Sequence, residues 1–391
     1  MPKSGPRTGI FMTELADTLT LRSSGRAETR PTLGSILEGA DARRNAFDTI
    51  RLLAAMSVIV SHSFLVTSGS NAIEPLYRLT AGQTSIGGLA VGVFFTISGM
   101  FIAASFDRSA SALEFVRKRA LRIMPALIVV IALSALVLGP LKTTLPLGEY
   151  FGARATWAYF ANAAFLPNSQ MLPGVFADHT VPFVNGSIWT LKFEVMCYAF
   201  TAFVMMTGRF KSPLVLAAWV MSFVISLLFP AAEQATGAMY YVVMGAKLFR
   251  FFGAGAVMYL YRHKVPIHSG LAAAGLALTV LVTMTPWFLE TAALFGSYSV
   301  IVFGYRAPGW FRQLTERGDI SYGVYVYGWP IQQLVWPIGE GQLMHWAINT
   351  TIALLLAVLA GLASWLLVEK PALKFKGRPK GLQRPAPAHA D

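Results

Sequence analysis

The sequence predicts an all-α fold, a membrane-embedded bundle of about ten transmembrane helices with both chain ends in the cytoplasm. Three observations predict it. First, 55% of the 391 residues are hydrophobic and only 13% are charged, about half the charged fraction of a soluble domain. Second, the chain contains ten apolar runs, most of them long enough to cross a bilayer. Third, the lysines and arginines gather between alternate runs.

Each predicted helix corresponds to one apolar run, and a transmembrane helix needs about 20 such residues. The run at 291–305 is short, and the stretch 270–305 can also be divided differently. Residues 156–166 are too few to span, and we expect an interfacial or re-entrant helix there. The ten runs lie at 50–67, 86–105, 121–141, 186–207, 213–230, 238–261, 270–288, 291–305, 320–337 and 346–368.

Two polar segments flank the predicted transmembrane domain, which covers residues 46–371. Residues 1–45 contain no spanning run and no apolar signal-peptide core, so we expect a flexible cytoplasmic tail. Residues 372–391 are basic and Pro-rich, which predicts a second cytoplasmic tail.

The basic residues set the predicted orientation. With the N-terminus inside, 25 of the 32 lysines and arginines fall in inside segments, and only Arg78, Lys142 and Arg154 in outside loops. The net charge of +13 is then explained by basic residues that lie at the cytoplasmic face, near anionic lipid headgroups. A nucleic-acid partner is not expected, because the basic residues follow the topology and form no single face. The lone cysteine, Cys197, excludes a cysteine-based metal site, and no metal is expected.

Ionisable residues inside the apolar runs are the candidate functional residues, since a charge at the bilayer centre costs about 2.5–3.5 kcal/mol or more. Arg51 and Lys192 also suit positions near the membrane interface. Lys247 and Arg250 lie in the middle of a run, so we expect them to face the bundle interior and meet Glu194, an anionic ligand or water. The full set is Arg51, His62, Lys192, Glu194, Lys247 and Arg250.

Arg51 and His62 belong together by geometry. Eleven residues of helix span about 16 Å, roughly three turns, and leave the two side chains about 20° from overlap on one face. A histidine near neutral pKa suits general-base work on a hydroxyl. A packed, hydrogen-bonded histidine is the alternative interpretation.

Six motifs, in order over residues 45–371, resemble those of acyltransferase family 3, membrane enzymes that move acyl groups from a cytoplasmic donor onto sugars. The sequence departs from the family pattern at Gly328, where a histidine or aromatic residue is common, and at Met100, where an aromatic residue is commoner. Either departure can alter acceptor or acyl preference. The motifs are FDTIRLLAAMSVIVSH with Asp48, Arg51 and His62; Phe94-Phe95-Thr-Ile-Ser98-Gly99; Arg119-Ala-Leu-Arg122-Ile-Met-Pro125; NGSIWTLKFEVMCY with Trp189 and Glu194; GDISYGVYVYGWPIQ at 318–332; and Glu369-Lys370-Pro371.

The resemblance implies an O-acyltransferase of the bacterial inner membrane. It implies transfer of an acyl group, most simply acetyl, from acetyl-CoA or another acyl-CoA to a hydroxyl of a cell-envelope or exported saccharide. Arg119 and Arg122, three residues apart, are expected to bind the donor phosphates together, with Lys118 assisting. Positive-inside topology explains these residues equally well. His62 would take the acceptor's proton or carry the acyl group transiently.

The other motif residues have more than one expected role. Arg51 positions the donor or stabilises developing negative charge. Glu194 orients His62 or pairs with Lys247 or Arg250. Ser98 is expected to allow close helix packing beside Gly99 rather than to act as a nucleophile. Trp189 is most simply a packing or interface aromatic.

Two other function classes stay open at this point. A secondary transporter that exports a glycan precursor or small metabolite also suits intramembrane charges and helices broken by Gly and Pro. It predicts inverted-repeat halves, which the sequence does not display. A non-catalytic scaffold predicts that Arg51 and His62 are both dispensable. The acyl group, the acceptor and the oligomeric state are not determined by the sequence.

Overall fold

The fold is a bundle of helices in a computed structural model that describes residues 31–39, 42, 44–165, 170–229, 235–316, 318–336 and 342–376. Within these ranges the structure contains helices and two isolated β-bridges but no strand. This agrees with the predicted all-α class. The remaining residues, including most of both predicted tails, lie outside the described part.

Every predicted apolar run contains a helix, and within the described residues eight helical stretches are long and apolar enough to cross a membrane, against the ten expected. The two shorter helices are α13 (Ser269–Leu281) and α17 (Ser321–Val335). The others are built on α3 (Phe47–Ser68), α5 (Ile86–Asp107), α6 (Ala112–Leu133), α10 (Leu191–Met205), α11 (Lys211–Leu228), α12 (Gly237–Leu260), α15 (Ser297–Arg306) and α18 (Gln342–Ser364).

Several of these stretches are made of more than one helical segment. π-Helical turns extend α6 into α7 (Gly139–Lys142) and α18 into α19 (Lys370–Leu373). In the uncertain stretch 270–305, α13 is followed by a loop and then by a short α14 (Phe288–Thr291). A π-helical turn continues α14 into α15. Residues 156–166 were expected to form one short helix. They hold the end of α9 (Arg154–Ala158) and a 3₁₀ helix at Tyr159–Ala164.

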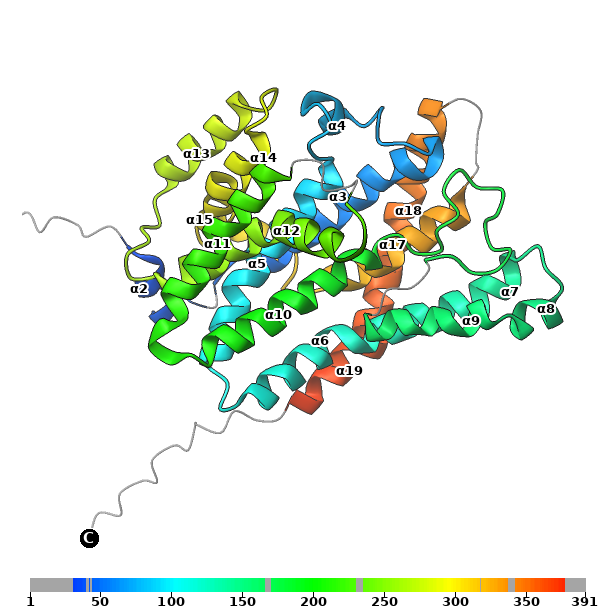
Figure 1. The fold of residues 1–391 in the computed structure, drawn as a ribbon, viewed down its shortest axis with the longest axis horizontal. Coiled ribbons are helices and arrows are strands. Elements are labelled where there is room, and N and C mark those ends of the chain that lie inside the picture. Colours follow the sequence, from blue (N-terminus) through cyan, green and yellow to red (C-terminus); the bar gives the residue numbers. More distant parts are fainter. Residues whose placement is uncertain are drawn as a thin grey trace, which may run out of the picture.

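Helices α3, α5 and α12 occupy the middle of the bundle (Figure 1). In the most apolar stretch of α5 and of α12, about two thirds of the residues are buried. The corresponding share for α11, which lies at the periphery, is 11%. Glycines allow α5 and α12 to touch backbone to backbone. A Cβ at Gly99 would overlap the carbonyl oxygen of Phe252, and one at Gly255 would overlap that of Thr96. Small residues at a crossing permit this approach between membrane helices.

Local capping fixes where the site-bearing helices begin. The Ser111 hydroxyl accepts from the Glu114 amide at 3.1 Å and starts α6, while Glu114 in turn accepts from the Ala110 amide at 2.7 Å. The pair of bonds resembles a capping box, except that the Glu114 carboxylate reaches the amide before the N-cap and not that of Ser111 itself. It sets the phase of α6, which carries Arg119 and Arg122 in its following turns.

Both predicted tails contain helical residues. Residues Leu33–Glu38 form α2, and the Leu33 amide donates to Val265 O at 2.8 Å. After Glu369 the chain continues as α19 and a 3₁₀ turn at Lys374–Lys376, which lies beside α6 (Figure 1). The Arg117 guanidinium donates to Phe375 O at 2.7 Å and ties this segment to α6.

Candidate functional site

Two cavities lie along one face of α5 and share part of their walls. The α5 residues that line them recur every three or four positions, as one face of a helix requires. We call them the histidine cavity, which His62 lines, and the arginine cavity, which Arg51, Arg108, Arg119 and Arg122 line. The α5 residues on the two walls are Gly87, Gly88, Val91, Phe94, Phe95, Ser98, Phe101, Ile102 and Ser105.

The arginine cavity has a volume of about 450 Å³. Its walls come from α3, α5, α6, α10, α17 and the segment after Glu369, which supplies Leu373 and Lys376. At Asn45 and Asp48 it adjoins a polar recess of about 530 Å³, which Arg44 and Arg312 also line. The combined space is long, polar and rich in cationic side chains.

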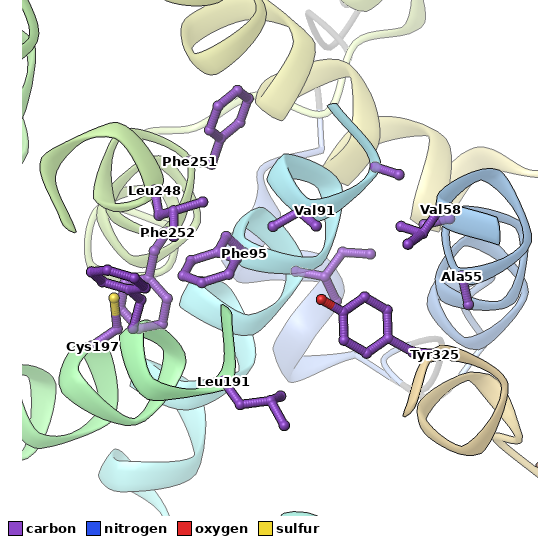
Figure 2. Packing of buried hydrophobic residues seen from close by; sticks show 14 of the residues in the cluster. Ala55, Val58, Val91, Phe95, Leu191, Cys197, Leu248, Phe251, Phe252 and Tyr325 are labelled. Carbon is purple, nitrogen blue, oxygen red and sulfur yellow. The ribbon is translucent and has the colours of Figure 1, made fainter. Parts of the chain in front are cut away.

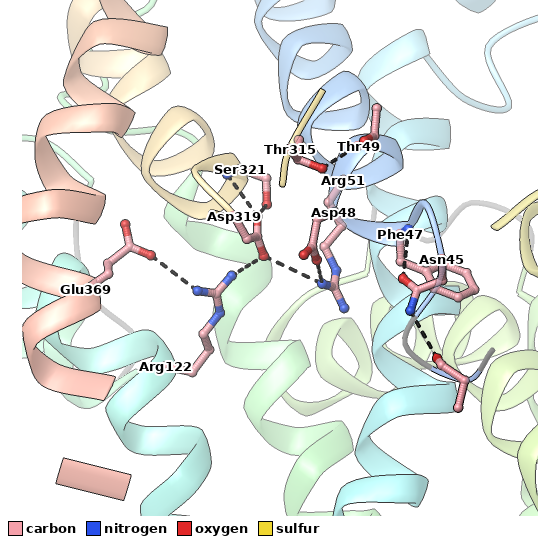
Figure 3. Close-up of polar contacts among 11 residues, drawn as sticks. Asn45, Phe47, Asp48, Thr49, Arg51, Arg122, Thr315, Asp319, Ser321 and Glu369 are labelled. Atoms are coloured by element: carbon pink, nitrogen blue, oxygen red, sulfur yellow. Dashed lines mark hydrogen bonds and ion pairs between the residues drawn. The ribbon is translucent and has the colours of Figure 1, made fainter. Parts of the chain in front are cut away.

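A buried carboxylate, Asp319, joins two of the four arginines (Figure 3). It accepts from the Arg122 guanidinium and lies 3.6 Å from Arg51 Nη1. Arg51 also pairs with Asp48 at 2.8 Å, and Arg122 approaches Glu369 at 3.5 Å. Arg51 and Arg122 therefore belong to one ion-pair network that ties α3, α6, α17 and the end of α18 together.

The protonation of Asp319 follows from these neighbours. Burial by itself raises the pKa of the carboxyl group, but Arg122 and Arg51 outweigh it, and Ser321 adds hydrogen bonds from its amide and hydroxyl. The pKa of Asp319 is consequently lowered below its usual range, so the carboxylate is charged at neutral pH.

Three other cations on the arginine cavity are not neutralised in this way. Arg108, Arg119 and Lys376 line it, and none of them forms an ion pair with a residue in the described part of the chain. The Arg119 Nε atom is also buried without a hydrogen-bond partner among those residues. Because a buried guanidinium N–H normally has an acceptor, this donor suits an anionic ligand.

Lys118 was expected to assist Arg119 and Arg122, and the structure places it elsewhere. It pairs with Glu114 at 2.8 Å and is not on the wall of the arginine cavity. The reason is helical phase, since a residue next to Arg119 points about 100° away. Arg119 and Arg122 do share the cavity face, as their spacing predicts.

Glu194 lies in the arginine cavity and makes neither of its expected contacts with His62 and Arg250. Its Oε1 atom accepts from Tyr198 Oη and, at 3.2 Å, from Ser98 Oγ. Ser98 thus faces the cavity, and the close packing expected of it is performed by its neighbour Gly99. Arg250 instead pairs with Glu290 at 2.5 Å and is 2% exposed, which indicates a structural ion pair between α12 and α14.

The histidine cavity has a volume of about 210 Å³ and mixed chemistry. His62, Lys247, Tyr77 and Trp189 lie on its walls, together with hydroxyl and glycine residues from the start of α5. The His62 ring meets the Trp329 indole edge to face at 4.8 Å. Its Nδ1 atom is buried and has no partner among the described residues. An imidazole with an unused nitrogen can exchange a proton with a bound ligand.

Arg51 and His62 both turn inward from α3, although they line different cavities. Between them α3 is packed by residues such as Ala55 and Val58, which are 0% and 2% exposed (Figure 2). Lys192, the remaining ionisable residue of the predicted spans, lies over the rings of Tyr240 and Tyr241 at 5.3 and 5.1 Å.

Several site residues were missed by reasoning from the sequence. Asp319 and Glu369 belong to two of the motifs that resemble the family, but the sequence analysis assigned no role to either carboxylate. Their place in these motifs was a signal that could have found them. Arg108 and Lys376 had no signal beyond their place in predicted inside segments. Tyr198 lies one helical turn after Glu194, the spacing at which helix neighbours meet.

The bundle of apolar helices and the two cavities lined by ionisable side chains define a multi-pass membrane protein, a class that contains both transporters and membrane transferases. A family model described as an acyltransferase domain matches residues 44–369, and the chain belongs to that family, acyltransferase family 3. It is an acyltransferase, which sets aside the transporter and scaffold interpretations as its primary role.

Two relatives match nearly end to end. An O-acetyl transferase of Shigella phage Sf6 is 31% identical over 345 residues, which cover 84% of this chain and 96% of the relative. Nodulation protein 10 of Rhizobium leguminosarum bv. viciae is 29% identical over 371 residues, which cover 88% and 97%. No solved structure matches.

Proposed function

We propose that the protein is an O-acetyltransferase of the bacterial inner membrane that moves acetyl from acetyl-CoA to a hydroxyl of a cell-envelope or exported saccharide. The observation that carries the proposal is the buried Nδ1 of His62, which has no hydrogen-bond partner within the described part of the chain and lies in a cavity adjoining one rich in arginine. The name of the phage relative supports acetyl as the group transferred.

The arginine cavity is the proposed donor site. The phosphates of acyl-CoA need cations, and Arg108, Arg119 and Lys376 supply charges that form no ion pair with a residue in the described part of the chain. All three stand in segments that the positive-inside pattern places in the cytoplasm, where the donor is made. The adjoining recess with Arg44 and Arg312 adds room for the nucleotide end of the donor.

The histidine cavity is the proposed place of reaction. His62 removes the proton from the acceptor hydroxyl, the oxygen forms a bond to the thioester carbonyl carbon, and the carbon–sulfur bond breaks. The proton passes from His62 to the departing thiolate, so charge and atoms balance. In the second route a ring nitrogen of His62 bonds to the thioester carbon, and the CoA thiolate leaves with the proton that the ring gives up. The acceptor hydroxyl then attacks the acetyl-imidazole, and its proton returns to the freed ring, so this route also balances. Both routes require His62.

The test uses His62→Ala and, as a matched control, His263→Ala, whose side chain is 60% exposed and remote from both cavities. Each variant is purified in detergent and incubated with ¹⁴C-acetyl-CoA and surface polysaccharide from the producing strain. We expect label in the polysaccharide with the unmodified protein and His263→Ala, and none with His62→Ala. Full labelling by His62→Ala removes His62 from the reaction.

A mass measurement separates the two routes. Without acid quenching, which would hydrolyse an acetyl-imidazole, the intact protein is measured at neutral pH with acetyl-CoA and no acceptor. An increase of one acetyl group, absent from His62→Ala, identifies the covalent route, and an unchanged mass in protein that is active with acceptor identifies direct transfer.

A further inference from the structure

The two cavities meet at two side chains. Val91 of α5 and Tyr325 of α17 are the residues, within the described part of the chain, that line both. Val91 is 8% exposed and Tyr325 is 7% exposed. Figure 2 shows Tyr325 reaching from α17 toward α5, which carries Val91.

Tyr325 is held in place as one side of this junction. Its hydroxyl group lies 2.7 Å from Thr190 Oγ1 and donates to Ser187 O at 2.9 Å. Its ring meets Phe94 at 5.7 Å. A buried aromatic fixed by its hydroxyl and by its ring gives a wall of constant shape.

Val91 forms the opposite side of the junction, where the size of the side chain sets the space left beside Tyr325. It follows Gly87 and Gly88 by one turn and precedes Phe94 and Phe95 by one turn, so it stands where α5 passes from one cavity to the other. Its side chain is the smallest apolar one among the lining residues of α5 apart from the glycines, and it hydrogen-bonds to nothing.

We propose that Val91, opposite the fixed ring of Tyr325, determines the size of the acyl group that the enzyme transfers. The inference rests on the proposed function. Val91 and Tyr325 stand in the wall that the two cavities share. An acyl group carried by a donor at the arginines and reacting at His62 must therefore pass between these two side chains. A branched side chain at position 91 leaves room for a short acyl group and hinders a longer one.

The experiment compares acetyl-CoA with butyryl-CoA as donors for the unmodified protein and for Val91→Ala and Val91→Leu. The readouts are free CoA thiol and acyl ester on the same polysaccharide. One methylene in an apolar pocket changes selectivity by roughly 10–200-fold. We therefore expect Val91→Ala to raise the butyryl-to-acetyl rate ratio at least about tenfold, and Val91→Leu to lower acetyl transfer.

The matched control is Val93→Ala, which makes the same change two residues along α5, at a position that lines neither cavity. It is expected to keep the original ratio. An unchanged ratio in Val91→Ala, or an equal shift in Val93→Ala, overturns the proposal. If the unmodified protein transfers no acyl group from either donor, the proposed function itself fails, so the two failures are distinguishable.

Discussion

The imidazole of His62 meets the indole of Trp329 edge to face, with their ring centroids 4.8 Å apart and their planes at 76°. Trp329 is itself fixed, because Nε1 donates to Phe183 O at 2.8 Å and its ring lies against Gly186, where a Cβ would come within 2.7 Å. The indole therefore holds the orientation of the imidazole.

Trp329→Phe is expected to lower kcat for acetyl transfer by about tenfold or more, because small misplacements of a reacting group are costly. The KM for acetyl-CoA should stay unchanged, since Trp329 does not line the arginine cavity. Steady-state kinetics on the purified protein measures both. The exposed Trp157→Phe is the control, and an unchanged kcat in Trp329→Phe contradicts the positioning role.

Arg119→Ala is expected to weaken donor binding, because Arg119 lines the arginine cavity and its buried Nε atom has no hydrogen-bond partner among the described residues. A hydrogen bond to a charged group contributes about 1.5–3 kcal/mol, or roughly 10–150-fold in affinity. Competition of unlabelled CoA against a labelled donor measures the affinity for CoA. Lys118→Ala, one residue away and outside the cavity, should change affinity less than about twofold. Equal losses in both variants would indicate only a general effect of surface charge.

Asp319→Asn is expected to destabilise the fold, since Asp319 lies between Arg51 and Arg122 and is 8% exposed. Removing one partner of a buried ion pair costs about 3–5 kcal/mol. Thermal unfolding in detergent should show a clear drop in Tm. Asp178→Asn, whose carboxylate is 82% exposed, is the control. A Tm equal to that of the control would show that the network contributes little.

The same network predicts a direction for pH dependence. The pKa of Asp319 is lowered in the folded state from its ordinary value of 3.8. Its stabilising contribution is therefore complete above that value and is lost as the pH falls through the lower folded pKa. The difference in Tm between the unmodified protein and Asp319→Asn should be constant from pH 8 to pH 5. A difference that shrinks within this range contradicts the lowered pKa.

Gly99→Ala tests the crossing of α5 and α12. The added methyl group would overlap the carbonyl oxygen of Phe252, which is backbone and cannot rotate away. Overpacking of this kind costs about 1–3 kcal/mol or more. We expect a lower Tm and a smaller yield of monodisperse protein in size-exclusion chromatography. Gly148→Ala, where a Cβ meets nothing within 4 Å, should behave as the unmodified protein.

The sequence was sufficient for the helical class and for the approximate place of each apolar helix, because a lipid-embedded helix must carry a continuous apolar run. It also predicted that Arg119 and Arg122 share one helix face, and that Arg51 and His62 share another, because the direction of a side chain around its helix is a local property. The helix count was less certain, since α13 and α17 are too short to be spans by length alone.

Partners across the bundle were decided only by the tertiary structure. Nothing local to Asp319 indicates that it meets Arg122, 197 residues away, or that Glu290 rather than Glu194 pairs with Arg250. The separation of Arg51 and His62 into two cavities, joined at Val91 and Tyr325, likewise depends on how α3, α5 and α17 pack. Helical periodicity determines which way a side chain points. Packing between distant segments determines what it meets there.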